Sequence, residues 1–186
     1  MNFDPLTHTY SINGVRVPSV TQIIGRVIPR TFNADEWALH RGSMVHRAAA
    51  LALTDELDMD TVDDRIKGRV QSTIKAVSQF KWKTFAIEQM MGHPFGFAGT
   101  PDLITQCGTL VDWKGTIDAC AEIQLGFYSL LSRENKINVK KLCAVKVQDS
   151  GEYKVEFYNQ RRAEGLAMAC FSMYGWMVKN KIGEKE

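Results

Sequence analysis

Three short segments in the middle of the chain have the residue composition of β-strands and are separated only by turn residues. They cover residues 83–91, 95–106 and 109–115, with Gly-His-Pro and Cys-Gly between them. Because connections this short join neighbouring antiparallel strands, we expect three consecutive and mostly antiparallel strands here. The protein is therefore expected to contain a sheet built from the middle of its sequence.

Patterns typical of helices precede and follow these strands. The other expected elements are a hairpin around Asn13-Gly14, helices ending at Ile28 and covering 34–53, 61–80, 118–133 and 160–179, and a strand pair at 141–148 and 152–159. This order predicts a mixed α/β fold, or an α+β fold, with a central sheet flanked by helices. No Pro/Gly-rich linker interrupts the chain, so we expect one domain covering residues 1–186.

Local signals support the first helices. Ser19 and Gln22 have the spacing of a capping box, and Asn33 can cap the helix expected over 34–53. Apolar residues recur at helical spacing between 61 and 80, and we expect them to form a core face; they are Val62, Ile66, Val70, Ile74 and Val77. The closing helix is rich in aromatic residues and methionine, and we expect these to pack in the core rather than to stack on bases; they are Phe171, Met173, Tyr174, Trp176 and Met177.

Composition limits the class of protein. The 186 residues carry 23 basic and 21 acidic side chains, for a net charge of +2, with 45% hydrophobic residues. These proportions exclude a disordered chain, a collagen and a disulfide scaffold, and any polyanion site has to be a local patch. We find neither a secretory signal nor a stretch of about 20 apolar residues that could span a membrane. We therefore expect an intracellular protein with reduced cysteines and no membrane partner.

Two of the central strands carry acidic residues that could act together. Asp112 and Lys114 alternate on one strand and so point to the same face, and Asp102 follows Gly99-Thr100-Pro101 on the strand before. A surface salt bridge explains the first pair, and a turn-capping role explains Asp102. Taken together, however, two neighbouring carboxylates repel each other unless a cation lies between them, which favours a divalent metal site.

These residues resemble the signature of the PD-(D/E)XK nuclease superfamily, which here reads Pro101-Asp102 and then Asp112-Trp113-Lys114. The chain is similar in particular to the RecB-like and phage-type exonuclease branch, since Gly42 and His46 match a Gly-x-x-x-His helix and Gln124 and Tyr128 match a Gln-x-x-x-Tyr helix. Residues 10–24 also look like the start of phage and mitochondrial-genome-maintenance exonucleases. The resemblance implies a restriction-endonuclease-like core extended by an N-terminal hairpin and helices.

The resemblance also implies roles for individual residues. The metal ligands would be His46, Asp102, Asp112 and the backbone carbonyl of Trp113, with Lys114 orienting the attacking water. Glu88 resembles an acidic residue that many members use in the metal shell, although a solvent-facing strand carboxylate is an equally good interpretation. Gly42 would let its helix approach the sheet closely.

Further residues resemble DNA contacts of this branch. Gln124 and Tyr128 share a helical face and would lie at the mouth of the site, although helix packing also explains Tyr128. Arg41 and Arg47 flank the histidine motif and could meet the DNA backbone, and a solvated helix face explains them equally well. A basic cluster after the same helix could contact a polyanion; it comprises Arg133, Lys136, Lys140 and Lys141.

The function implied is a DNA exonuclease that depends on one or two Mg²⁺ or Mn²⁺ ions, acting in phage recombination or replication in the host cytoplasm. A single-strand annealing or single-strand-binding protein is the partner that the family suggests. The alternatives are a structure-selective or site-specific endonuclease and a non-catalytic DNA-binding protein. An iron–sulfur cluster is not expected, because the four cysteines, at 107, 120, 143 and 170, are widely scattered.

Overall fold

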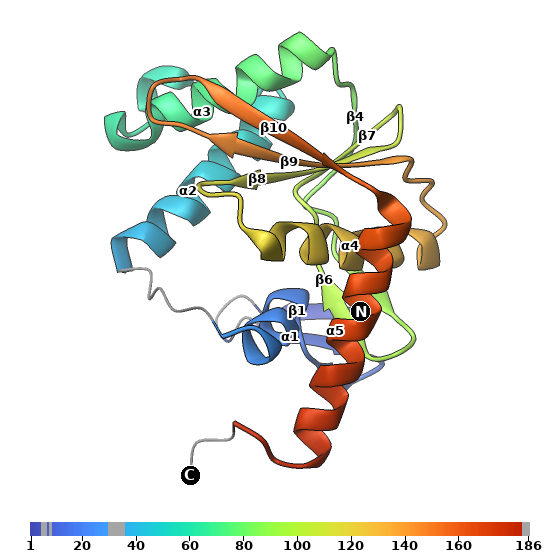
Figure 1. Ribbon diagram of the computed structural model, residues 1–186. Helices are drawn as coiled ribbons and strands as arrows, with labels where there is room; N and C mark the ends of the chain where they lie inside the picture. Colours follow the sequence, from blue (N-terminus) through green and yellow to red (C-terminus); the bar gives the residue numbers. More distant parts are fainter. Residues whose placement is uncertain (5–6, 8, 30–35, 184–186) are drawn as a thin grey trace.

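The computed structural model describes residues 1–4, 7, 9–29 and 36–183, and its centre is a five-stranded mixed sheet (Figure 1). The strand order is β10-β9-β8-β7-β4. The strands are β4 (Thr84–Ile87), β7 (Leu103–Thr105), β8 (Thr109–Lys114), β9 (Lys141–Val147) and β10 (Tyr153–Tyr158). Only β8 and β9 run parallel, while the other neighbours are antiparallel. The expected mixed α/β fold with a central sheet is therefore confirmed.

Helices cover both faces of this sheet, as Figure 1 shows. One face packs on α2 (Glu36–Leu53) and α3 (Asp64–Phe80), which a 3-10 helix, Met59–Thr61, precedes. The other face packs on α4 (Ala119–Glu134), and α5 (Gln160–Lys179) and α1 (Val20–Val27) pack on α4 in turn. The expected flanking helices are thus present on both sides.

Alternation along β8 decides which residues face which helices. Leu110 belongs to the apolar core beneath α4, whereas Val111 and Trp113 belong to the core beneath α2 and α3. Asp112 and Lys114 share the parity of Leu110 and so lie on the α4 side of the sheet. The expectation that they share a face is confirmed, because their charged atoms lie 2.7 Å apart.

Two of the three expected central strands are divided in the structure. The segment 83–91 breaks at Glu88, whose left-handed φ of 42° ends β4 before β5 (Met91–His93) begins. The segment 95–106 breaks at 100–102, where Pro101 has no N–H to donate to a ladder, between β6 (Phe97–Gly99) and β7. β5 and β6 pair with each other in a separate ribbon. The prediction of three uninterrupted strands was therefore wrong.

The N-terminal hairpin and the first helix are confirmed. β2 (Thr9–Ile12) and β3 (Val15–Val17) pair across Asn13-Gly14, and a further strand, β1 (Asn2–Asp4), extends them to three. Both turn residues have positive φ, as a tight hairpin turn requires. Ser19 and Gln22 form the expected capping box at the start of α1. The expected cap Asn33 lies outside the described residues.

The expected burial of the helices α3 and α5 was confirmed for most residues and wrong for a few. The expected helix over 61–80 begins only at Asp64, because the Asp63 side chain accepts the N–H of Arg65 and caps it. Four of the five expected core residues are confirmed, because Val62, Ile66 and Val70 are buried and Val77 packs against the same core, whereas Ile74 is 39% exposed. In α5, Phe171 packs on Phe97 as expected, but Met173 and Trp176 are 48% and 55% exposed. The exposed face of each helix is therefore wider in the structure than the sequence pattern predicted.

Candidate active site

Asp102 joins the loop before β7 to two other elements. The carboxylate accepts the backbone N–H of Trp113 on β8 at 2.7 Å through Oδ2, and Oδ1 lies 3.0 Å from Nδ1 of His46 on α2. The carbonyl oxygen of Asp102 accepts the N–H of Glu88 at 3.1 Å. Asp102 is buried. Each of its polar groups therefore fixes a different part of the site.

Asp112 is the centre of a second, adjoining network. This carboxylate is only 1% exposed, and Oδ2 lies 2.7 Å from Nζ of Lys114. Gln124 on α4 connects the two, since its Nε2 donates to Oδ1 of Asp112 at 3.2 Å and its Oε1 accepts from Lys114 at 2.8 Å. The Gln124 amide also contacts the Tyr128 hydroxyl at 3.0 Å. Gln124 and Tyr128, one turn apart on α4, thus hold the Asp112–Lys114 pair.

Burial and neighbouring charges shift the pKa values of these groups. The charge of Asp102 raises the pKa of His46 to about 9, against the effect of burial. Burial also opposes ionisation of Asp102, but the charge and hydrogen bond of His46 outweigh it and hold its pKa below the usual range. Burial raises the pKa of Asp112, and the charge of Asp102 adds to this rise while Lys114 opposes it. At neutral pH His46 and Asp102 therefore form an ion pair.

A cavity of about 260 Å³ opens beside these networks, and most of its polar lining is basic. Arg41, His46, Arg69 and Lys114 contribute side chains to its wall, and Gly42 and Gly115 leave space in it. A Cβ on Gly42 would meet no atom within 4 Å, so the expected close approach of this helix to the sheet at Gly42 was wrong. The glycine instead lies at the wall of the cavity.

The structure brings together most, but not all, of the residues that the sequence pointed to. His46, Asp102, Asp112, Lys114, Gln124 and Tyr128 form the two adjoining networks described above. Glu88 is exposed at the turn after β4, and within the described residues its side chain has no hydrogen bond or ion pair to either aspartate. Arg41 lines the cavity, whereas Arg47 is exposed on α2 outside it.

Gln124 and Tyr128 occupy a different place from the one expected. Both are buried, at 6% and 5% exposure, and neither lines the cavity. They were expected at the mouth of the site, but α4 holds them behind the Asp112–Lys114 pair. Burial also raises the pKa of Tyr128 well above its usual value, so its hydroxyl stays neutral. Their position suits them to orient Lys114.

The donor set can be compared with what a divalent cation requires. Two carboxylates, an imidazole and nearby backbone carbonyls are oxygen and nitrogen ligands suited to Mg²⁺ or Mn²⁺. Asp112 Oδ2 is buried and, within the described residues, accepts no hydrogen bond, although Lys114 Nζ is close to it. Three His, Cys, Asp or Glu side chains do not converge on one point anywhere in the described chain. The types of donor atom therefore suit a divalent cation, while in this structure His46 pairs with Asp102 and Lys114 pairs with Asp112.

Arg69 is a residue of this site that we did not identify from the sequence. It lies on α3, ahead of the first strand of the main sheet, and lines the cavity together with Lys114 and His46. No motif marks it, and its spacing on α3 is that of an ordinary polar position. Only the packing of α3 beside the ends of β8 and β9 places it here.

The arrangement is a mixed α/β core in which Asp112 and Lys114 lie on β8, the middle strand of the sheet, with Asp102 just before the neighbouring strand β7. A protein provisionally described as an exonuclease, from Eubacterium rectale, has the same fold with a TM-score of 0.55 and 15% identity, over 90% of this chain and 83% of that one. The alkaline exonuclease of Laribacter hongkongensis is similar at a TM-score of 0.45 and 10% identity, over 87% and 89% of the two chains. The structure of that exonuclease in complex with dAMP is similar at a TM-score of 0.45 and 11% identity, over 88% of this chain and 90% of that one.

Comparison by sequence gives no such relationship. No protein-family profile matches the chain, and no curated protein does. Among the described residues, no helix is both long enough and apolar enough to cross a membrane. The structural similarity therefore establishes the fold, while the chemistry has to be argued from the site.

Proposed function

We propose that this protein is a metal-dependent deoxyribonuclease of the PD-(D/E)XK type that hydrolyses phosphodiester bonds from DNA ends. One observation carries the proposal: a buried carboxylate, Asp112, is paired with Lys114 beside a second carboxylate, Asp102, next to a basic cavity. Burying two acidic groups side by side costs folding free energy, and a binding or catalytic task is a common reason for it.

The residues at hand suit hydrolysis of a phosphodiester. Asp102, Asp112, His46 and the Trp113 carbonyl would hold one or two Mg²⁺ or Mn²⁺ ions, which would make bound water more acidic and offset charge on the phosphate. Lys114, fixed by Gln124 and Asp112, would donate hydrogen bonds to the attacking water or to a phosphate oxygen. Arg41 would bind a neighbouring phosphate from the cavity wall. Water adds at phosphorus and one P–O bond of the chain breaks.

Digestion of two DNA substrates tests this proposal directly. End-labelled linear DNA and covalently closed circular DNA are incubated with the protein and Mg²⁺ or Mn²⁺, and the products are separated on gels. We expect the linear DNA to become short products and the circle to survive. Linearisation of the circle at low protein concentration would favour an endonuclease. A protein that cleaves neither substrate would contradict the proposal.

Metal dependence and site assignment need separate controls. EDTA should stop digestion, and added Mg²⁺ or Mn²⁺ should restore it. Calorimetric titration with Mn²⁺ should show weaker binding to the Asp102→Asn and His46→Ala variants, and this readout does not depend on activity. Asp60→Asn, a charge removal on the exposed 3-10 helix, is the matched control for Asp102→Asn. Equal Mn²⁺ binding by all variants would remove these residues from the metal site.

The wider role proposed here rests on the motif resemblance. Exonucleases of this branch act in phage recombination or replication, with a single-strand annealing or single-strand-binding protein as partner. Co-expression of this chain with a single-strand annealing protein, followed by size-exclusion chromatography, tests that assembly. Separate elution of the two proteins would contradict it.

A further inference from the structure

Three lysines form a row across the sheet, beginning at the site. Lys114 on β8 is the register partner of Lys146 on β9, and Lys146 is the register partner of Lys154 on β10. Register partners point to the same face, and adjacent strands lie about 4.8 Å apart, so the row extends over about 10 Å. Like charges directly opposite each other on a sheet are destabilising. The row therefore has an electrostatic cost in the isolated protein.

Only one lysine of the row has its charge balanced. Lys114 lies against Asp112, as described above. For Lys146 and Lys154, the described part of the chain provides no ion-pair partner. Lys146 is half-buried and Lys154 is exposed. Two unbalanced cations side by side are suited to binding an anion with repeated charges.

A second cavity places these two lysines next to the active site. Its volume is about 490 Å³, and it is lined by Lys146, Lys154 and Arg69 together with the β9–β10 turn. Arg69, Gly115 and Val147 also line the first cavity, so the two cavities adjoin. One groove therefore runs from His46 and Lys114, past Arg69, to the end of the lysine row.

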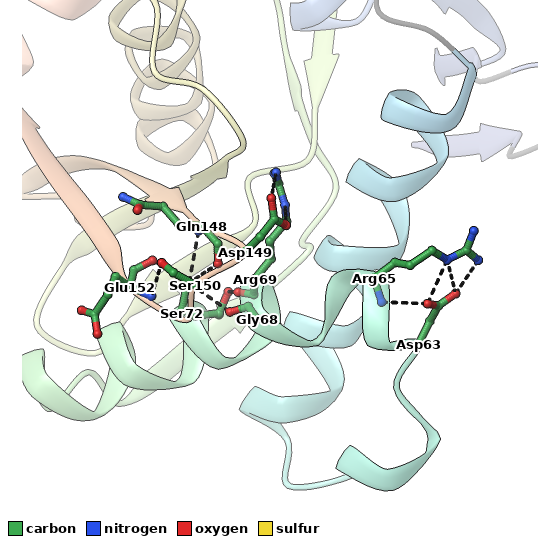
Figure 2. Close-up of polar contacts among 10 residues, drawn as sticks. Asp63, Arg65, Gly68, Arg69, Ser72, Gln148, Asp149, Ser150 and Glu152 are labelled. Atoms are coloured by element: carbon green, nitrogen blue, oxygen red, sulfur yellow. Dashed lines mark hydrogen bonds and ion pairs between the residues drawn. The ribbon is translucent and has the colours of Figure 1, made fainter.

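The wall of this groove is held in place by contacts between α3 and the β9–β10 turn, which Figure 2 shows. Asp149 accepts Nε and a terminal nitrogen of Arg69 at 2.6 and 2.9 Å. The Ser72 hydroxyl accepts the N–H of Gln148 at 3.1 Å and lies 2.7 Å from the carbonyl oxygen of Glu152. A Cβ on Gly68 would come within 1.9 Å of the Asp149 carbonyl oxygen, so this close approach requires glycine.

The ion pair between Arg69 and Asp149 also determines the net charge of the groove. Asp149 balances Arg69, and the two lysines are left as the net positive charge of the second cavity. Arg69 is thereby held at the junction of the two cavities, with its side chain only 13% exposed. A rigid, cationic groove that continues from a phosphodiester-cleaving site is suited to an extended polyanion.

We propose that this groove binds the sugar-phosphate backbone of the DNA strand beyond the scissile bond, with Lys146 and Lys154 each contacting a phosphate. The proposal rests on the nuclease function proposed above and adds the path that the strand follows. The row is about 10 Å long, so its lysines can reach neighbouring phosphates of one strand. Phosphate contacts of this kind position a strand without reading its sequence.

Binding of a labelled oligonucleotide tests the groove without any need for catalysis. A fluorescein-labelled single-stranded 20-mer is titrated in EDTA by fluorescence anisotropy over a series of KCl concentrations. Lys146→Gln/Lys154→Gln should weaken binding at least tenfold and reduce the magnitude of the salt slope by about 1.4, at about 0.7 per phosphate contact. The matched control is Lys179→Gln/Lys181→Gln, which removes two exposed charges at and just beyond the C-terminal end of α5.

A small substrate separates the groove from the chemistry. The p-nitrophenyl ester of thymidine 5′-monophosphate has a single phosphate and so offers Lys146 and Lys154 no phosphate beyond the scissile bond. The double variant should therefore hydrolyse it at the wild-type rate while its KM for the 20-mer rises. Unchanged affinity and salt slope in the double variant, or an equal loss in the control, would overturn the proposal. DNA binding that depends on the lysines in a protein without nuclease activity would sustain the groove and contradict only the nuclease function.

Discussion

His46 on α2 lies 3.0 Å from Asp102 at the start of β7, with Nδ1 facing Oδ1, although 56 residues separate them in the chain. This contact ties α2, which covers one face of the sheet, to the carboxylate that precedes β7. It also determines how both groups ionise, because each charge stabilises the other.

The metal-free protein should therefore lose stability at high pH through His46. Its pKa is raised to about 9 in the folded state, against about 6.5 when unfolded, so the stabilisation is complete below 6.5 and disappears as pH rises through 9. We expect a contribution of about 1 kcal/mol, since a third of the side chain is exposed. Urea unfolding between pH 6 and 10, compared with His46→Gln, measures it. A His46 NMR titration midpoint near 6.5 would contradict the assignment.

Asp112→Asn should reduce nuclease activity at least a hundredfold with little loss of stability. Burial raises the pKa of this carboxylate, so folding already disfavours its charge, and a neutral amide of the same size removes that cost. Thermal unfolding in EDTA should give a Tm equal to or above that of the wild type. A lower Tm together with retained cleavage would show that Asp112 has a structural role only.

Lys114→Ala should differ from Asp112→Asn in stability while having the same effect on activity. It leaves the buried Asp112 carboxylate without its counter-charge, which should cost about 1–3 kcal/mol of unfolding free energy. Combining the two changes should recover much of that loss, because the neutral amide needs no cation. Urea unfolding of the three variants measures the coupling. Additive losses would mean that the two side chains do not interact.

Gln124→Ala should lower kcat more than it raises KM, because the amide acts on the substrate only through Lys114 and Asp112. Tyr128→Phe removes one hydrogen bond from the same amide and should lower kcat less than Gln124→Ala does. The lost hydrogen bond should cost on the order of 1 kcal/mol of unfolding free energy. Steady-state kinetics on a defined oligonucleotide distinguish the two parameters. If KM rose at constant kcat, these residues would contact the substrate directly, as their motif first indicated.

Gly126→Ala should destabilise the protein by about 3 kcal/mol or more, because a Cβ there would lie 2.1 Å from the Ala163 carbonyl oxygen where α4 meets α5. Gly165→Ala is the matched control on α5. Its Cβ would meet nothing within 4 Å, so it should stabilise the helix by about 0.5–1 kcal/mol. Chemical unfolding of both variants checks this contrast, and similar effects would contradict the packing of α4 on α5.

Local sequence was sufficient for most elements and for the pairing of Asp112 with Lys114. The Asn13-Gly14 turn, the Ser19–Gln22 capping box and the alternation of Asp112 and Lys114 depend on neighbours within a few residues, and all three are confirmed. Strand boundaries were harder to predict, because β4 ends at Glu88, a residue with positive φ at a position where the sequence has no glycine or asparagine.

The sequence alone thus determined which residues can carry the chemistry, since the types and spacings of Asp102, Asp112 and Lys114 are properties of the chain. Their partners were decided only by tertiary structure. The burial of Gln124 behind Lys114 follows from the packing of α4, and the position of Arg69 follows from the close approach of Gly68 to the β9–β10 turn. The alignment of Lys114, Lys146 and Lys154 exists only through strand register. Side-chain periodicity is local, whereas the register between strands is set by the whole packed core.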